Sequence, residues 1–98
     1  MHITLSPIRH DTGLSLVRQG DCLIVNGESY DFSSLEEGAA LPRDAIDCPW
    51  LASDVVRHEG RIRLTLYLPI RAEAPAAARF PAPLEPDNGP VPLPEGAA

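Results

Sequence analysis

The sequence contains no lysine: all eight of its basic residues are arginines, and fourteen aspartates and glutamates outnumber them. A formal net charge of −6 repels a phosphate backbone, and no basic cluster with interleaved aromatic residues offsets it. The densest positive group, Arg57, Arg61 and Arg63, has Glu59 in its midst. We therefore expect no nucleic-acid partner.

Long hydrophobic runs are also missing. No stretch approaches the roughly 18 consecutive apolar residues of a membrane-spanning helix, so we expect no membrane partner. The first residues lack the basic segment and the apolar run of about 7–15 residues that mark a signal peptide. We expect a cytoplasmic protein that is not secreted by a signal peptide. In that reducing compartment Cys22 and Cys48 are expected to stay as free thiols, although folded geometry could allow a bridge.

Residue sets that carry catalysis or bind metals do not occur. The three histidines and two cysteines do not fall in Cys-x-x-Cys, His-x-His or His-x-x-x-His spacing. There is no Gly-x-Ser-x-Gly turn and no glycine-rich phosphate loop, and adjacent acids such as Glu36 and Glu37 are usually solvated. We expect no enzymatic activity, no cofactor and no metal.

The first third of the chain predicts short strands joined by tight turns. Ile3 and Leu5 alternate with polar residues in a short strand that Pro7 is expected to end. Gln19-Gly20 and Asn26-Gly27 are turn signals, because Gly and Asn tolerate positive φ. Together these signals predict a three-stranded meander over residues 14–18, 21–26 and 28–32.

The clearest element is a hairpin of residues 55–58 and 61–70 around Glu59-Gly60. Alternation with a period of two over its second strand predicts one buried and one solvent-facing side. The aliphatic residues expected to face the core are Ile62, Leu64, Leu66, Leu68 and Ile70. At roughly 1.5–3 kcal/mol for each buried side chain, they should supply a large part of the core.

The middle of the chain is less regular, and its end is rich in proline. Residues 33–49 predict at most two single helical turns, at 33–37 and at 42–46. Seven prolines follow Glu73, which favour polyproline II or irregular coil. We predict a small β domain over 1–73 and a proline-rich strap over 74–98. The strap is either a disordered tail or a segment that lies along its own body, a second subunit or another protein.

These elements predict an all-β fold of about five or six short antiparallel strands: a meander plus a hairpin, packed as a sandwich or half-open barrel, with an extended C-terminal strap. A body of this size buries only about 60 % of its surface. Docking of the strap or formation of a homo-oligomer would add buried area.

Protein contacts are the remaining class of function. Trp50 is expected either to close the open end of the β core or to anchor an interface. The residues of the hairpin's solvent-facing side and of the strap that are candidates for protein contact are Arg61, Arg63, Tyr67, Phe80, Leu84, Val91 and Leu93.

Several short segments occur in an order that carries a resemblance. They are Asp31-Phe32-Ser33-Ser34-Leu35, Glu37-Gly38-Ala39-Ala40-Leu41-Pro42, Gly60 with Leu64-Thr65-Leu66 and Leu68-Pro69, Ala74-Pro75, Arg79-Phe80-Pro81 and Gly89-Pro90-Val91-Pro92-Leu93-Pro94. In these the chain resembles small uncharacterised proteins of the tail-gene region of proteobacterial phages and prophages. The resemblance implies a non-enzymatic structural or assembly component of a phage tail, virion-associated or cytoplasmic, whose partners are other tail subunits. The alternative is a cytosolic accessory or regulatory module that binds a host or prophage protein.

Overall fold

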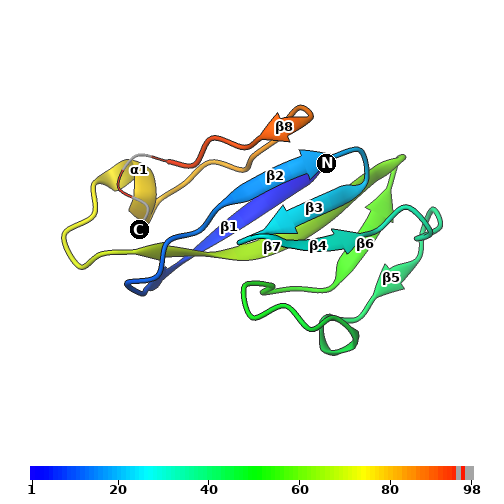
Figure 1. Cartoon of the computed structure of the whole chain (residues 1–98), viewed down its shortest axis with the longest axis horizontal. Helices are drawn as coiled ribbons and strands as arrows, with labels where there is room; N and C mark the ends of the chain where they lie inside the picture. Colours follow the sequence, from blue (N-terminus) through cyan, green and yellow to red (C-terminus); the bar gives the residue numbers. More distant parts are fainter. Residues whose placement is uncertain (95, 97–98) are drawn as a thin grey trace.

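Two four-stranded β-sheets pack face to face in the computed structural model, which describes residues 1–94 and 96 (Figure 1). Sheet A has the strand order β1-β7-β6-β5, and sheet B has the order β4-β3-β2-β8. In chain order the elements are β1 (His2–Arg9), β2 (Leu16–Gln19), β3 (Cys22–Val25), β4 (Glu28–Asp31), β5 (Ala40–Leu41), the 3₁₀ helix η1 (Arg43–Ala45), β6 (Val55–His58), β7 (Arg61–Ile70), α1 (Ala76–Arg79) and β8 (Gly89–Pro90). The all-β prediction is confirmed in its sandwich form, although the described residues form eight strands, more than the predicted number.

The predicted hairpin is present at the predicted residues. β6 and β7 pair antiparallel, with His58 opposite Arg61. Glu59 and Gly60 form the turn between them, and both have positive φ, at 51° and 76°. A two-residue turn of this kind matches the twist of the strands it joins.

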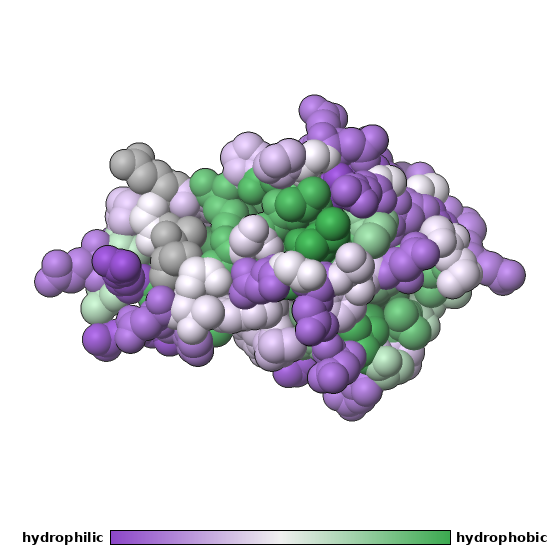
Figure 2. All heavy atoms as spheres, in the orientation of Figure 1, coloured by the Kyte–Doolittle hydropathy of each residue, from purple (hydrophilic) through white to green (hydrophobic). Residues whose placement is uncertain are grey.

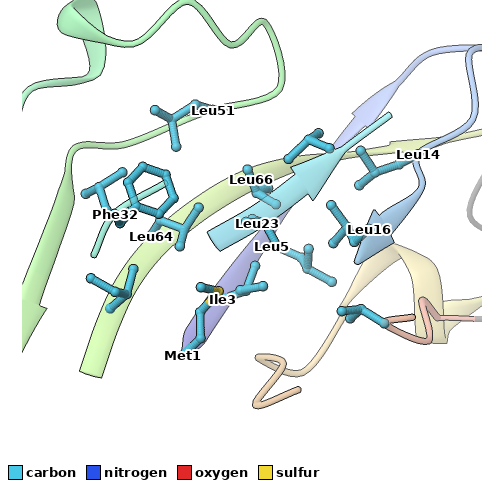
Figure 3. Close-up of a cluster of buried hydrophobic side chains, with 14 of the residues drawn as sticks. Met1, Ile3, Leu5, Leu14, Leu16, Leu23, Phe32, Leu51, Leu64 and Leu66 are labelled. Carbon is cyan, nitrogen blue, oxygen red and sulfur yellow. The ribbon is translucent and has the colours of Figure 1, made fainter. Parts of the chain in front are cut away.

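The core lies between the two sheets, and the inward face of β7 forms much of it (Figure 3). Four of the five predicted side chains, at positions 62, 64, 66 and 68, are almost completely buried, and Ile70 is half-buried. Sheet B contributes Leu16, Leu23 and Val25 from the opposite side. The remaining members of the core cluster are Met1, Ile3, Leu5, Leu14, Phe32, Leu51, Val55 and Val91.

The meander of β2, β3 and β4 is confirmed, with shorter strands than predicted. Asn26 and Gly27 form the second turn as expected, both with positive φ. The first turn is shifted by one residue. Gln19 pairs with Cys22, so the turn consists of Gly20 and Asp21, with Gly20 at φ 60° in the first turn position. Glycine at that position is what a type II′ turn requires.

Two predictions about the first strand are wrong. β1 continues through Pro7 to Arg9, and it pairs parallel with β7. The amide and carbonyl of Ile3 both bond Leu84 on the side of β1 away from β7. Alternate residues of a strand direct these groups to the same side, so Pro7 also faces away from β7. Its missing N–H therefore removes no bond to β7, which is why proline is tolerated in this edge strand.

The middle segment contains one of the two predicted helical turns. η1 follows Pro42, in agreement with the turn predicted at 42–46. Residues 33–37 form hydrogen-bonded turns and no helix, since Gly38 follows too closely. The segment also contains β5, which was not predicted and pairs with β6 at the edge of sheet A.

The strap lies along its own body and connects the edges of both sheets. Leu84 exchanges two backbone hydrogen bonds with Ile3 of β1, at 2.8 and 2.7 Å. Val91 donates to Leu16 of β2 at 2.9 Å, next to β8. The strap is less irregular than expected, because it includes α1 and β8. Residues 95, 97 and 98 of the predicted strap lie outside the described residues.

We expect Leu66→Lys to unfold the protein and Thr65→Lys to leave it folded. Leu66 is 1 % exposed in the core, where a charge has no partner. Thr65 lies on the opposite face of the same strand and is half-buried, so a lysine there can extend its ammonium to solvent. Circular dichroism during urea unfolding measures the stability of both variants. A cooperative transition in Leu66→Lys near the wild-type midpoint would contradict this assignment of the core.

Candidate protein-contact surfaces

The outward side of β7, here called the hairpin face, carries Arg61, Arg63, Thr65 and Tyr67. The guanidinium of Arg43 lies over the Tyr67 ring, 5.9 Å from its centroid. Arg63 is exposed and, among the described residues, forms no ion pair. The three contact candidates predicted on this strand therefore share one face. The charge of Arg63 on that face is not neutralised by an ion pair with a described residue.

Arg61 is tied to the strap. Its Nη1 donates to Oε1 of Glu85 at 3.0 Å, and the same oxygen lies 3.5 Å from Nδ1 of His2. The bond from His2, and then the positive charge of Arg61, hold the pKa of Glu85 below its ordinary value. Glu85 thus links the strap to both β1 and β7 at the surface.

A cleft of about 360 Å³ opens beside this contact. Four of its charged side chains, those of Arg18, Asp21, Arg61 and Glu85, are engaged with other side chains or with the backbone. Arg18 donates to the carbonyl oxygens of Pro86 and Gly20, at 2.6 and 2.9 Å, and Asp21 accepts from Arg57 at 2.8 Å. The residues that line the cleft are Met1, Arg18, Asp21, Gly60, Arg61, Ile62, Glu85, Pro86 and Asp87. We interpret this cleft as the structural junction where the strap meets two turns.

The four strap candidates divide by exposure. Val91 is only 7 % exposed, and Leu84 and Leu93 are half-buried against the core. Phe80 is the opposite case: it is 78 % exposed, and the Arg79 guanidinium lies 5.7 Å from its ring centroid. Leu84, Val91 and Leu93 thus fix the strap to its own body, whereas the Phe80 ring is exposed.

Hydrophobic side chains gather on the surface over β2 and the strap beside it (Figure 2). Val17 pairs with Ile24 on one side and with Pro90 on the other, and Leu16 and Val25, the neighbouring pair, face the core. Val17, Ile24 and Pro90 therefore form a row across the outer face of sheet B. Next to this row is an apolar hollow of about 240 Å³, lined by Leu84, Glu85, Pro86, Val91 and Pro92.

Trp50 is placed as the first of its two predicted roles requires. It packs against the core and is half-buried, as a residue that closes the end of the sandwich should be. Its ring makes a T-shaped contact with His10, with centroids 5.4 Å apart. It also lines an open pocket of about 220 Å³, here called the Trp50 pocket. The residues of the Trp50 pocket are Val25, Asn26, Glu28, Tyr30, Asp47, Pro49 and Trp50.

Arg57 has a role that the sequence did not reveal. Its side chain is 14 % exposed and joins the two sheets: from β6 it donates to Asp21 at 2.8 Å and to the Phe32 carbonyl at 3.2 Å, both in sheet B or at its margin. It also donates to the carbonyl oxygens of Leu35 and Gly60. Leu35 is 22 residues away from Arg57 in the sequence and Asp21 is 36 residues away, so no local pattern could have identified these contacts.

Glu37 is a second contact that sequence reasoning missed. Its carboxylate accepts the backbone amides of Gly60 at 2.6 Å and Glu59 at 2.9 Å, so it clasps the turn between β6 and β7. The bond from Gly60 is the main reason why the pKa of Glu37 lies below its ordinary value; the bond from Glu59 and the charge of His58 add to it. Glu37 was predicted to be a solvated acid, and the structure gives it a specific structural partner.

Within the part of the chain that the structure describes, no group of three or more histidine, cysteine, aspartate or glutamate side chains is placed to hold a metal ion. The same residues include no helix that is long and apolar enough to cross a membrane. Cys22 and Cys48 are free thiols. A comparison of the chain with protein-family models, curated proteins and solved structures finds no match.

Replacing Arg57 by alanine should lower the free energy of unfolding by about 2–4 kcal/mol, because it leaves Asp21 and several carbonyl oxygens without their donor. Arg63→Ala is the matched control on the neighbouring strand. It removes an exposed arginine without an ion pair in the described residues, so its effect should stay within about 0.5 kcal/mol. Urea unfolding measures the free energy of unfolding of both variants. Equal losses in the two variants would refute the role of Arg57 in joining the sheets.

Glu37 should stabilise the protein at neutral pH but not in acid. Its pKa is lowered by folding, so its contribution is complete above the ordinary value of about 4.5 and is lost as the pH falls through the folded pKa. Wild type should therefore unfold at a higher temperature than Glu37→Gln at pH 7, and this difference should shrink near pH 3.

Glu36→Gln is the control for this pH dependence. It removes a carboxylate one residue away that accepts no hydrogen bond from the described residues. Its melting temperature should follow that of the wild type more closely at both pH values. If the gap between wild type and Glu37→Gln stays constant with pH, the charge of Glu37 does not stabilise the turn.

Proposed function

We propose that this protein is a non-enzymatic structural or assembly component that acts through protein–protein contacts in the tail of a phage or prophage particle. Support for a phage tail comes from the short segments whose order along the chain resembles that of phage tail-region proteins. The observation that carries the proposal is the exposure of Phe80, the one large hydrophobic side chain of the described residues that is mostly exposed.

The backbone on both sides of Phe80 is attached to the body, although the Phe80 ring itself is exposed. Ala78, two residues before it, is completely buried, and Leu84, four residues after it, is bonded to β1. The segment that carries Phe80 is therefore attached to the body on both sides. Little further ordering is needed when such a side chain binds, which favours affinity.

Phe80 also has a suitable neighbour. The Arg79 guanidinium lies 5.7 Å from its ring centroid, and phenylalanine and arginine are both enriched at protein interfaces. Burying the ring against a partner would contribute about 1.5–3 kcal/mol to binding. Arg63 and Tyr67 on the hairpin face offer a second set of residue types that interfaces favour.

A point substitution tests this better than removal of the strap. Deleting residues 74–98 would also uncover Ile3 and Leu16, which the strap engages, so a loss of assembly could reflect unfolding. The two phenylalanines of the chain form a matched pair instead: Phe80 is 78 % exposed and Phe32 is 5 % exposed.

Phe80→Ala should leave the melting temperature unchanged and reduce incorporation into particles by at least about tenfold, as the loss of about 1.5–3 kcal/mol of binding implies. Phe32→Ala should instead lower stability by about 3–5 kcal/mol. The measurement is the copy number per particle, by quantitative mass spectrometry of particles purified after induction of the prophage, with the variants in place of the wild-type gene.

A fixed copy number for the wild type, with loss for Phe80→Ala, supports the proposal. Full incorporation of Phe80→Ala would remove Phe80 from the mechanism. Wild-type protein found only in the lysate, with one soluble partner, would favour an accessory or regulatory module instead.

A further inference from the structure

The Trp50 pocket is formed where the sandwich opens along the β4 edge. Tyr30 pairs with Leu23, and Glu28 pairs with Val25. Since Leu23 and Val25 face the core, Glu28 and Tyr30 also lie on the inward face of sheet B. At this edge their side chains meet the segment that contains Asp47, Pro49 and Trp50.

The walls of the Trp50 pocket are attached to both sheets. The Trp50 carbonyl accepts the amide of Tyr67 in β7 at 2.8 Å, and the next residue, Leu51, bridges to Leu66. On the other wall, the Tyr30 hydroxyl donates to the Asp47 carbonyl oxygen at 3.1 Å. These contacts hold the two aromatic residues as walls that exist before any ligand arrives.

The rim of the Trp50 pocket is negative. Glu28 and Asp47 are exposed, and neither carboxylate forms an ion pair with any residue in the described part of the chain. From the described residues, the Glu28 carboxylate accepts only a long bond, which the Tyr30 hydroxyl donates at 3.5 Å. Among the residues that the structure describes, no arginine or histidine lines the pocket. Burial, reinforced by Cys48, Glu28 and Asp47, raises the pKa of the Tyr30 phenol.

Aromatic walls, together with carboxylates whose charge no described residue neutralises, suit one chemical class. The electron-rich faces of tryptophan and tyrosine attract cations, and the carboxylates add charge complementarity. A volume of about 220 Å³ accepts the end of a side chain, since pockets for whole drug-sized ligands span about 300–1,000 Å³. We propose that the Trp50 pocket binds the cationic end of an arginine or lysine side chain from a partner protein.

This inference goes beyond the proposed function and does not depend on it. The Trp50 pocket lies at the β4 edge of sheet B, and the strap pairs with the opposite edge through β8. The two surfaces can therefore be changed independently. Cation binding can be measured on the purified chain alone, so its failure would leave the particle experiment with Phe80→Ala unaffected.

Trp50 is the only tryptophan of the chain, so its fluorescence reports directly on the pocket. The probes are Nα-acetyl-arginine methylamide and Nα-acetyl-lysine methylamide, which have uncharged backbone ends. The matched neutral probe is Nα-acetyl-citrulline methylamide, which has the shape of arginine without its charge. For a single side chain we expect saturable changes in Trp50 emission with dissociation constants on the order of 1–10 mM. We expect no saturation with citrulline.

The pocket variant Glu28→Gln/Asp47→Asn should weaken cation binding by about fivefold or more, since it removes both carboxylates. Glu36→Gln/Glu73→Gln changes the net charge equally at exposed positions outside the pocket, and it should bind as the wild type does. Circular dichroism checks that both remain folded. If the pocket variant does not fold, the proposal is tested on the wild-type chain alone, by whether the arginine probe binds more tightly than the citrulline probe.

Saturation with both cationic probes, or with either one, supports the proposal, and the stronger probe identifies the guanidinium or the ammonium as the preferred group. Three results would overturn it: no saturable change with either cation, equal binding of citrulline, or wild-type affinity in the pocket variant.

Discussion

Burial of one face of β7 is the constraint on which the rest of this small fold depends. β7 pairs with β1 along one edge and with β6 along the other, and Leu51 bridges to it beyond the end of β6. Its inward leucines and isoleucines meet Leu16, Leu23 and Val25 of sheet B. At about 1.5–3 kcal/mol for each buried side chain, this contact is the main reason why the two sheets stay together.

Polar and backbone contacts then close the margins of the sandwich. At the end where the β2–β3 and β6–β7 turns lie, Arg57 joins the sheets through Asp21 and Phe32, and Glu37 clasps the second turn. Along the side, the strap covers the exposed edges of β1 and β2 through Leu84 and β8. Covering an edge strand in this way also blocks unwanted pairing with other chains.

Two of the surfaces that these contacts leave open differ in their chemistry. The strap presents Phe80 with Arg79, and the β4 edge presents the Trp50 pocket with its unpaired carboxylates. One surface is apolar, and the other is negative; we propose that the first is buried by association and that the second binds a cation. For the proposed tail component, surfaces of such different chemistry would let two partners be distinguished.

The sequence by itself determined the all-β class, the hairpin of β6 and β7, and the turn at Asn26-Gly27, because alternation along a strand and positive φ in a turn are local properties. It also determined which face of β7 is buried. Only the tertiary structure decided that β1 pairs parallel with β7, that Leu84 bonds Ile3, and that Arg57 reaches Asp21. The Trp50 pocket belongs to the same group, since Tyr30 and Trp50 meet only when β4 and the segment before β6 come together. Such contacts join residues that are far apart in the chain, and no local pattern specifies which distant partner a strand edge or a side chain will meet.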